Sequence, residues 1–429
     1  MRDVHRLGCG DGVQLKTILN RVQKQRSFVY GQVRWVEMPG RLAIEVEVKP
    51  RSNSRPRCSG CGRQGPGYDT LSARRFEFVP LWGIAVFFLY AMRRVGCRDC
   101  GVKVEAVPWA SGKHQQTDAH ACFLAGWAKR LSWKEVAEAF HTSWEKVFRS
   151  VEMAVEWGRA HQRLTGIQAI GIDEIQWQYG QKYLTLVYQI DAHCRRLLWI
   201  GKERKAKTLL GFFRWFGKER SAALRFICSD MWRPYLKVVA KKAAAAAHVL
   251  DRFHIMSLLS KAIDQIRAEE AKALKAGGYE PVLTRARWLL LKRPENLTEK
   301  QEPRLAELLR YNLRSVRAYL LKEDFQFFWG YRSPYWAGRF LDRWCTRTLR
   351  SRLEPMKRVA RTLRDHRELL LNWFRAKGSI SGGAVEGFNN KAKLTMRKAY
   401  GFRTYRALEV ALYHALAALP EPETTHRFC

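Results

Sequence analysis

The sequence predicts a multidomain protein of mixed α and β structure. Three observations carry this prediction. The N-terminal region alternates like β-strands and contains two close pairs of cysteines, the middle of the chain switches repeatedly between strand-like and helical spacing, and residues 255–375 are almost wholly helical in pattern. The chain has 429 residues, and at about 150 residues per domain it should form two to four folded units.

Residues 1–57 are expected to form a small α+β segment. Apolar side chains recur at helical spacing over residues 14–22, which predicts a short helix. Residues 28–48 then alternate like two strands, and the turn between them is expected at Pro39 and Gly40.

Residues 58–112 are predicted to be a zinc-binding β domain. A strand-like stretch over residues 76–95, interrupted by Pro80 and Gly83, separates two CxxC pairs. The four thiols are Cys58, Cys61, Cys97 and Cys100. Paired thiolates on two turns can supply all four ligands of a structural Zn²⁺ ion. Buried or redox-active cysteines are the alternative to zinc.

Residues 113–165 are predicted to be a helix-turn-helix DNA-binding domain. Helical spacing covers residues 118–130, 132–140 and 144–157. Ser132 followed by Glu135 has the capping-box spacing, and Ser143 can cap the third helix. A generic helical hairpin fits the pattern nearly as well.

Two basic residues of the third predicted helix, Lys146 and Arg149, are the candidate DNA contacts. In a helix-turn-helix the second helix of the motif enters the major groove, and cations on it meet phosphates or bases. Exposed lysines and arginines on any other helix would give the same pattern.

Residues 166–254 alternate between strand and helix in the order βββαβαβ. The strands are expected at 167–175, 183–191, 196–200, 224–228 and 247–250, and the helices at 206–216 and 232–242. In this order the first and fourth strands can be neighbours in one sheet.

Residues 255–375 are expected to be an all-helical domain. Its helices should be interrupted at Gly277-Gly278, Pro294, Pro303, Ser333-Pro334 and Pro355. After a glycine- and serine-rich segment at 378–383, a last helix is expected from Ala384 to Ala399, within a final region of residues 376–419.

The charge of the chain points to a polyanionic partner. Lysine and arginine number 77 against 40 acidic residues, which gives a formal charge of +37 and a pI of about 10.2. Extended basic surfaces favour contacts with phosphates. Composition alone leaves a ribosomal-type RNA binder and a membrane-surface protein as alternatives.

The sequence predicts a cytoplasmic protein without a membrane span. The longest apolar stretch, residues 79–92, is too short to cross a bilayer. The N-terminus has no apolar signal core. Most of the 10 cysteines are scattered singly, which fits a reducing compartment.

Three acidic residues stand where a catalytic cation site could form. Asp173 and Asp230 each end a predicted strand, and adjacency of the first and fourth strands would bring them together. Glu386 near the start of the last helix can complete the group. Carboxylates repel one another unless divalent cations neutralise them, and two Mg²⁺ or Mn²⁺ ions about 4 Å apart would catalyse in-line phosphoryl displacement. A single Asp after a strand is more often a cap or turn residue.

The last predicted helix carries further polar residues on the face of Glu386. Asn389, Lys393 and Arg397 follow at spacings that share one helical face. A carboxylate followed by an amide and two cations suits a metal ligand beside a DNA strand. An ordinary solvated polar face is the alternative.

At these residues the chain resembles bacterial insertion-sequence transposases of the DDE type, most closely the ISL3 group, over nearly its whole length. The matching pieces are both cysteine pairs, the predicted helix-turn-helix and residues 171–174, 229–235, 251–254, 386–393, 397 and 400–402. The resemblance implies an RNase H-like catalytic core, formed by 166–254 and 376–419, that the helical domain interrupts.

The resemblance also implies roles for individual residues. Asp173, Asp230 and Glu386 look like the metal-binding triad. Asp251 and His254 match a D-x-x-H signature and would support catalysis, unless Asp251 only caps a helix and His254 packs under it. Trp232 could stack on an exposed base, although a buried aromatic is the plainer interpretation.

The resulting hypothesis is a transposase that binds terminal inverted repeats, cleaves the ends and joins them to target DNA. Double-stranded DNA would be its partner, a homodimer or higher oligomer would form on the DNA, and the protein would associate with the nucleoid. The alternatives are a non-catalytic, transposase-derived DNA-binding regulator and a DNA nuclease without strand transfer.

Overall fold

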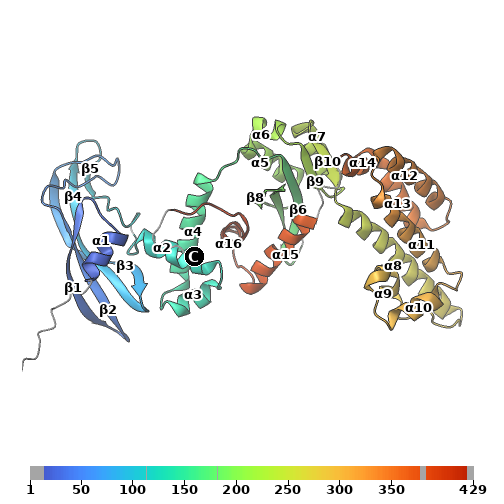
Figure 1. Cartoon of the computed structure of the whole chain (residues 1–429), viewed down its shortest axis with the longest axis horizontal. Coiled ribbons are helices and arrows are strands. Elements are labelled where there is room, and N and C mark those ends of the chain that lie inside the picture. The colour runs from blue at the N-terminus through green and yellow to red at the C-terminus, as the bar shows by residue number, and fades with distance from the viewer. Residues whose placement is uncertain (1–13, 113, 181, 377–382, 423–429) are drawn as a thin grey trace, which may run out of the picture. The chain divides into compact units, whose positions relative to one another are not determined.

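The structure is a computed structural model that describes residues 14–112, 114–180, 182–376 and 383–422 (Figure 1). The chain divides into two compact units. The first contains residues up to 162 together with 398–415 and the chain from 419 on, and the second contains 163–397 with 416–418. Of the glycine- and serine-rich segment expected at 378–383, residues 378–382 lie outside the described residues.

The first unit begins with a five-stranded sheet beside a short helix. Its elements are α1 (Leu15–Val22), β1 (Phe28–Met38), β2 (Arg41–Pro50), β3 (Gly67–Leu81), β4 (Ile84–Cys97) and β5 (Gly101–Val104). The strand order is β1-β2-β4-β3, with β5 paired to β4. The hairpin turn at Pro39 and Gly40 is confirmed. The second hairpin turns at Trp82 and Gly83, so β3 continues through Pro80 instead of stopping there.

Trp109, which follows β5, fills the centre of this sheet's core. Its indole is 2% exposed and meets the rings of Phe28, Tyr90 and Phe76 edge-on at centroid distances of 4.8, 5.2 and 6.1 Å. Such edge-to-face pairs add to the stabilisation from buried area. A residue outside the helices and strands therefore contributes a large buried side chain to the core of this sheet.

Four helices complete the first unit. They are α2 (Asp118–Ala128), α3 (Trp133–Ala139), α4 (Trp144–His161) and α16 (Tyr405–Leu416). The predicted capping box at Ser132 and Glu135 is confirmed, and the Ser143 hydroxyl caps α4. Arg406 of α16 contacts Glu152 of α4 at 2.8 Å, so a C-terminal helix packs beside the N-terminal helices.

The second unit contains the sheet that the βββαβαβ pattern predicted. Its elements are β6 (Ala169–Gln178), β7 (Lys182–Asp191), β8 (Cys194–Lys202), α5 (Ala206–Phe216), α6 (Lys218–Ala222), β9 (Phe226–Ser229), α7 (Arg233–Lys242) and β10 (Ala247–Leu250). The strand order is β10-β9-β6-β7-β8. Strands β6, β7 and β8 are antiparallel neighbours, and β9 pairs in parallel with both β6 and β10. The predicted adjacency of the first and fourth strands is confirmed.

The two faces of this sheet carry different helices. Ile170 and Ile172 of β6 pack into one core with side chains of α5 and α7. Gly171 points to the opposite face, where Val385 of α15 (Gly383–Lys398) lies against it. Alternate residues of a strand face opposite sides of the sheet. Residue 173 therefore faces the same side as Gly171, and residue 174 faces α5 and α7.

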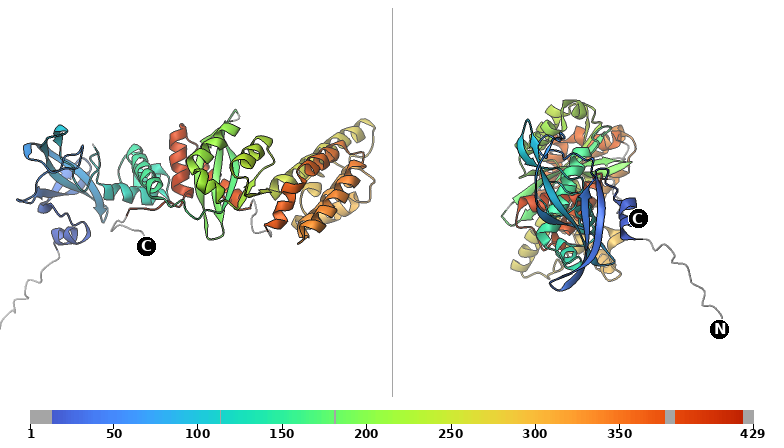
Figure 2. Two further views of the ribbon diagram at one scale, coloured as in Figure 1. Left: turned by 90° about the horizontal axis from the view of Figure 1, so that it is seen from above. Right: turned by 90° about the vertical axis from the view of Figure 1, so that its left-hand side faces the viewer.

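The remaining residues form a helical part, which Figure 2 shows in yellow to orange as a bundle of its own. Its elements are α8 (Arg252–Ala276), α9 (Arg287–Leu291), η1 (Pro294–Asn296), α10 (Gln301–Leu308), α11 (Arg314–Gln326), η2 (Phe327–Gly330), α12 (Pro334–Leu349), α13 (Glu354–Asp365) and α14 (Arg367–Arg375). In the described part of the chain, no helix combines the length and hydrophobicity of a bilayer span.

The prolines of this part start helices more often than they interrupt them. Pro334 and Pro355 lie in the first turns of α12 and α13, and Pro294 begins η1. The predicted break at Pro303 is wrong, because this residue is the third of α10. Proline is tolerated in a first turn, where its missing N–H would have no helical partner.

Candidate carboxylate site and cysteine cluster

Asp173 lies on β6 and faces α15. The Asn389 side-chain amide of α15 donates to Asp173 Oδ2 at 2.6 Å, and the Tyr188 hydroxyl of β7 donates to Asn389 Oδ1 at 2.9 Å. Burial raises the pKa of Asp173 above its usual value. A hydrogen bond from the Glu174 backbone N–H lowers this pKa but does not cancel the rise. The predicted strand and the predicted last helix therefore meet at this carboxylate.

Asp230 follows β9, the strand beside β6. Its Oδ1 accepts from the Trp232 backbone N–H at 3.0 Å, and its Oδ2 accepts from Arg204 Nη2 at 2.5 Å. The Arg204 guanidinium lies over the Trp232 ring at 4.8 Å. Trp232 is half-buried and also meets Tyr235 at 4.7 Å. The predicted base-stacking residue is thus a partner of an arginine in this structure.

Asp251 and His254 form a contact next to these carboxylates. Asp251 is the N-cap of α8 and accepts from the Phe253 backbone N–H at 2.9 Å, so it does cap this helix, while the His254 side chain is 35% exposed. His254 Nδ1 lies 3.1 Å from Asp251 Oδ2. This hydrogen bond, helped by the charges of Asp173 and Asp230, raises the pKa of His254 to about 9. At neutral pH the imidazole is therefore a cation among acids.

Glu386 occupies an exposed position on α15, one turn before Asn389. Lys393 and Arg397 are exposed as well, whereas Asn389 is buried. The face predicted to be polar is therefore exposed at Glu386, Lys393 and Arg397 but buried at Asn389. Within the described residues, the cysteine cluster is the one group of three or more ligand residues whose ligand atoms all lie within 4.8 Å of one another. The three carboxylates of the predicted triad do not converge that closely here.

Two site residues were missed by sequence reasoning, Glu174 and Arg204. The Glu174 side chain is 8% exposed, and its Oε1 lies 3.2 Å from Arg204 Nε. Burial raises the pKa of Glu174 to about 7, and the negative charge of Asp230 adds to this effect. The positive charge of Arg204 lowers the pKa but does not cancel the rise. An acid directly after Asp173 in a strand is a visible signal. No sequence pattern marks Arg204, because its partners come from other strands.

The two candidate DNA contacts of α4 lie in different surroundings. Lys146 Nζ pairs with the buried carboxylate of Glu77 on β3 at 2.5 Å, which connects α4 to the N-terminal sheet. Arg149 is exposed. The charge of Lys146 is therefore occupied inside the unit, and Arg149 is the better placed of the two for a phosphate.

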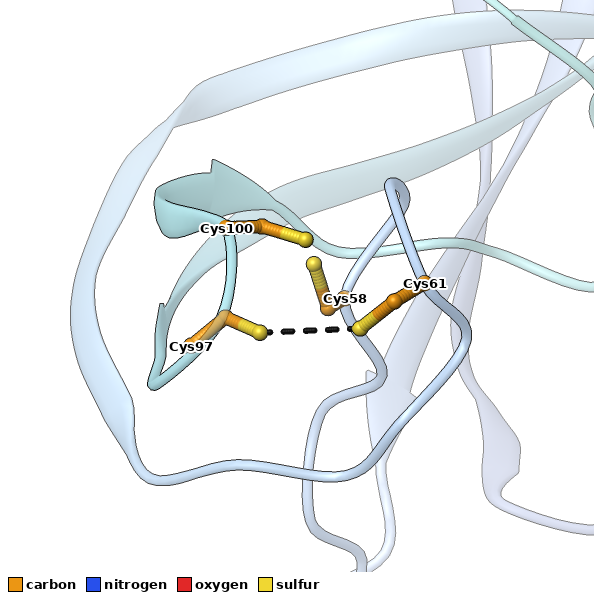
Figure 3. A group of neighbouring side chains, drawn as sticks. All are labelled: Cys58, Cys61, Cys97 and Cys100. Carbon is orange, nitrogen blue, oxygen red and sulfur yellow. Dashed lines mark hydrogen bonds between the residues drawn. The ribbon is translucent and has the colours of Figure 1, made fainter.

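The four cysteines of the CxxC pairs come together as the spacing predicted. Figure 3 shows their side chains pointing toward one another from two turns. The sulfurs all lie within 4.8 Å of one another, and those of Cys61 and Cys97 are 3.5 Å apart. Backbone N–H groups of Cys61 and Gly60 lower the pKa of Cys58 to about 7. A group of four sulfurs with thiolate-stabilising N–H donors fits a structural Zn²⁺ ion.

Comparison with known proteins adds a family to this geometry. The family model for DDE transposases of the ISL3 type, described as "Transposase", matches residues 170–412. The match covers more than half of the chain and includes Asp173, Asp230 and Glu386.

Two curated relatives align over most of their length. The transposase for insertion sequence element IS1001 of Bordetella parapertussis is 26% identical, with 87% of this chain and 91% of the relative covered. The transposase for insertion sequence element IS1557 of Mycobacterium tuberculosis is 31% identical, with 85% of this chain and 86% of the relative covered.

Proposed function

We propose that this chain, which belongs to the ISL3 family of DDE transposases, cleaves and joins DNA at the site around Asp173. One observation carries the location of the site. Parallel pairing of β6 with β9 puts Asp173 and Asp230 on neighbouring strands, and Asn389 ties α15 to Asp173. Glu386 lies one turn before Asn389 on the same helix and is proposed to share a cation with the two aspartates.

The core around this site is proposed to be RNase H-like. Three antiparallel strands followed by two parallel strands, in the order β10-β9-β6-β7-β8, support this assignment. The helical part from α8 to α14 would then be an insertion between β10 and α15. The proposed core consists of 166–254 and 376–397, because residues 398–415 of the predicted last segment, 376–419, belong to the first unit. Residues 255–375 are the proposed insertion. The predicted segments 1–57 and 58–112 share one sheet, and 113–165 is the proposed DNA-binding domain.

Asp173, Asp230 and Glu386 are proposed to hold two Mg²⁺ or Mn²⁺ ions. The donor set fits, since all three residues offer carboxylate oxygens, which these hard cations prefer. When bound, such ions activate the attacking oxygen and stabilise the leaving oxygen of a phosphodiester.

Other residues of the chain would prepare this chemistry. Asn389 orients Asp173 through its side-chain amide, and His254, held by Asp251, brings a positive charge to the carboxylates. Lys393 and Arg397 are exposed further along α15, where they can contact the phosphates of the strand to be cut.

Recognition of the transposon ends is proposed to involve the first unit. Helices α3 and α4 are joined by a tight turn, which fits a helix-turn-helix, and Arg149 is exposed on the second of them. The double-stranded DNA bound would comprise the terminal repeats and the target, and two ends must be held together, which requires a dimer or higher oligomer. A formal charge of +37 supports a nucleic acid partner.

Cys58, Cys61, Cys97 and Cys100 are proposed to bind one structural Zn²⁺ ion. Four thiolates leave no open position on the metal, so the ion would stabilise the two turns rather than take part in catalysis. Metal analysis of the purified protein should find zinc, and Cys61→Ser together with Cys100→Ser should remove it. Equal zinc content in the double variant would contradict the assignment.

The proposed function is tested on DNA that carries the repeats flanking the gene. The wild-type protein should cleave this DNA with Mg²⁺ and should join a pre-cut end to plasmid, whereas Asp173→Asn and Glu386→Gln should do neither. Glu299→Gln, an exposed acid on the helical part, is the matched control and should stay active. DNA binding should persist in all variants.

The outcomes separate the three candidate functions. Cleavage that survives in Asp173→Asn would reject the carboxylate assignment. Cleavage without joining would indicate a nuclease, and binding without cleavage in the wild type would indicate a regulator.

A further inference from the structure

We infer that Arg204 is a positioning residue whose positive charge neutralises the carboxylate site while no metal is bound. When a divalent cation binds, Arg204 releases Asp230 to it. The inference rests on the proposed function, which assigns Asp230 to cation binding. It goes beyond that function by giving a role to Arg204 and Glu174.

The guanidinium of Arg204 bridges two carboxylates from different strands. Its Nη2 donates to Asp230 Oδ2 at 2.5 Å, and its Nε lies 3.2 Å from Glu174 Oε1. The carboxylate side chains are 13% and 8% exposed, whereas the Arg204 side chain is 36% exposed. One protein cation thus sits between two nearly buried acids and can still leave toward solvent.

The contact between Arg204 and Glu174 is an ion pair without a well-formed hydrogen bond. Glu174 Oε1 and Arg204 Nε are buried and form an ion pair 3.2 Å apart, but neither atom makes a hydrogen bond of good geometry. Buried ion pairs that stabilise a fold generally also have their donors and acceptors hydrogen-bonded, because an unmatched buried polar group is costly. Glu174 Oε1 is therefore paired with Arg204 by charge without a well-formed hydrogen bond, which leaves the guanidinium easier to displace than a fully hydrogen-bonded one.

Strand geometry explains why Arg204 matters for Asp230. Asp173 and Glu174 are consecutive on β6, so their side chains point to opposite faces of the sheet. Asp230 accepts from the backbone N–H of Trp232, the N-cap of α7, and from Arg204, which also contacts Glu174. Arg204 therefore holds Asp230 toward Glu174, while Asp173 is held by Asn389.

The Trp232 ring gives the Arg204 guanidinium a second favourable contact. The guanidinium lies over this ring at 4.8 Å, and the ring itself is fixed against Tyr235. A cation over an aromatic face keeps part of its stabilisation after it gives up an ion pair. Arg204 can thus release Asp230 and stay at the site, where its charge would then meet a DNA phosphate.

The inference predicts a distinctive effect on cation affinity. A guanidinium in contact with Asp230 competes with a divalent cation for the same oxygen and repels it. Arg204→Gln should therefore bind Mn²⁺ about tenfold more tightly than the wild type, even though its DNA cleavage should fall. If Arg204 only stabilised the fold around the site, its loss would leave Mn²⁺ affinity unchanged or weaker.

The test is calorimetric titration of the zinc-loaded, full-length protein with Mn²⁺ alone, together with thermal melting of each variant. Arg204→Lys keeps the charge and should stay within about threefold of the wild-type affinity. Arg214→Gln removes an exposed charge from α5 of the same unit and should also match the wild type.

Each outcome addresses either the inference or the function beneath it. Unchanged or weaker Mn²⁺ binding in Arg204→Gln, or equal tightening in Arg204→Lys, overturns the counter-cation role. Asp173→Asn reports on the proposed function separately, because Mn²⁺ binding that persists in that variant would reject the carboxylate site itself.

Discussion

Asn389 is a buried amide whose two ends meet different strands. Its Nδ2 donates to Asp173 Oδ2 on β6, and its Oδ1 accepts from the Tyr188 hydroxyl on β7. Burial raises the pKa of Tyr188, so the phenol keeps its proton and remains a donor. The amide orientation is thereby fixed, and with it the direction in which Asp173 presents its other oxygen. Residues that orient a metal ligand in this way affect activity without touching the substrate.

Asn389→Ala should lower Mg²⁺-dependent cleavage by about 10- to 100-fold, because Asp173 loses the donor that orients it. The free energy of unfolding should fall by about 1–3 kcal/mol, since the substitution leaves the Tyr188 hydroxyl buried without an acceptor. Cleavage assays and denaturant unfolding measure the two effects. Asn390→Ala, at the exposed next position of α15, should change neither. Equal rates for the two variants would show that Asn389 does not position Asp173.

At the scale of elements, the approach of α15 to β6 brings the last helix to the strand of Asp173. The contact depends on a glycine. A Cβ at Gly171 would lie 2.3 Å from Val385 Cγ2, well inside van der Waals contact. The Tyr188 and Phe388 rings stack beside it at 4.9 Å. A small residue in the strand therefore lets the helix come close enough for Asn389 to reach Asp173.

Gly171→Ala should destabilise the second unit by about 1–3 kcal/mol, because α15 must move away to make room for the methyl group. Cleavage should fall with it, since Asn389 and Glu386 move with the helix. Val385→Ala in the same chain should restore part of both. Unfolding curves of the single and double variants give the coupling between the two positions.

Gly387→Ala is the control for this experiment, since a Cβ there meets nothing within 4 Å. The proposed docking would be refuted if Gly171→Ala were as stable and as active as this control, or if Val385→Ala failed to compensate.

At the scale of the whole molecule, both units contain a buried, neutral histidine. Burial lowers the pKa of His120 on α2 from 6.5 to about 4, and burial does the same for His248 on β10. The side chains are anchored by polar contacts, with Gln116 Nε2 3.3 Å from His120 Nδ1 and Ser229 Oγ 2.7 Å from His248 Nε2. At these two positions the unfolded chain therefore takes up a proton at a higher pH than the folded protein does.

The contribution of these two histidines to stability should fall as the pH drops from about 6.5 to about 4, against an opposite contribution from Glu174, whose raised pKa favours the folded state as the pH falls below about 7. In this pH window the histidines are protonated in the unfolded chain but remain neutral in the folded protein. Their contribution to the free energy of unfolding therefore decreases as the pH is lowered. The loss is absent above this window and complete below it, and it amounts to about 3 kcal/mol for each histidine. Unfolding curves at pH 7 and pH 5 measure it.

His120→Gln should reduce the difference in stability between pH 7 and pH 5, because glutamine does not titrate. His161→Gln, at an exposed position of α4, should leave that difference as in the wild type. An equal pH dependence in His120→Gln and the wild type would rule out His120 as a source of the acid sensitivity.

The order of elements in the second unit was determined by the sequence, because it depends on local spacing. The helix at 206–216 and the strand at 247–250 begin and end where the hydrophobic period changes, as predicted. The adjacency of β6 and β9 followed from that order, and the cysteine cluster followed from the two CxxC pairs. The break at Pro303 was predicted wrongly, since a proline in a first helical turn gives the same local signal as one that stops a helix.

Only the tertiary structure decided which side chains meet at the site. Asn389 and Asp173 lie 216 positions apart, and Arg204 reaches Asp230 and Glu174 from the bend that follows β8. Lys146, an exposed cation by its pattern, turned out to pair with Glu77 of the N-terminal sheet. Hydrophobic spacing specifies each helix or strand and its buried face, but long-range polar pairs arise from packing between elements and leave no periodic trace in the chain.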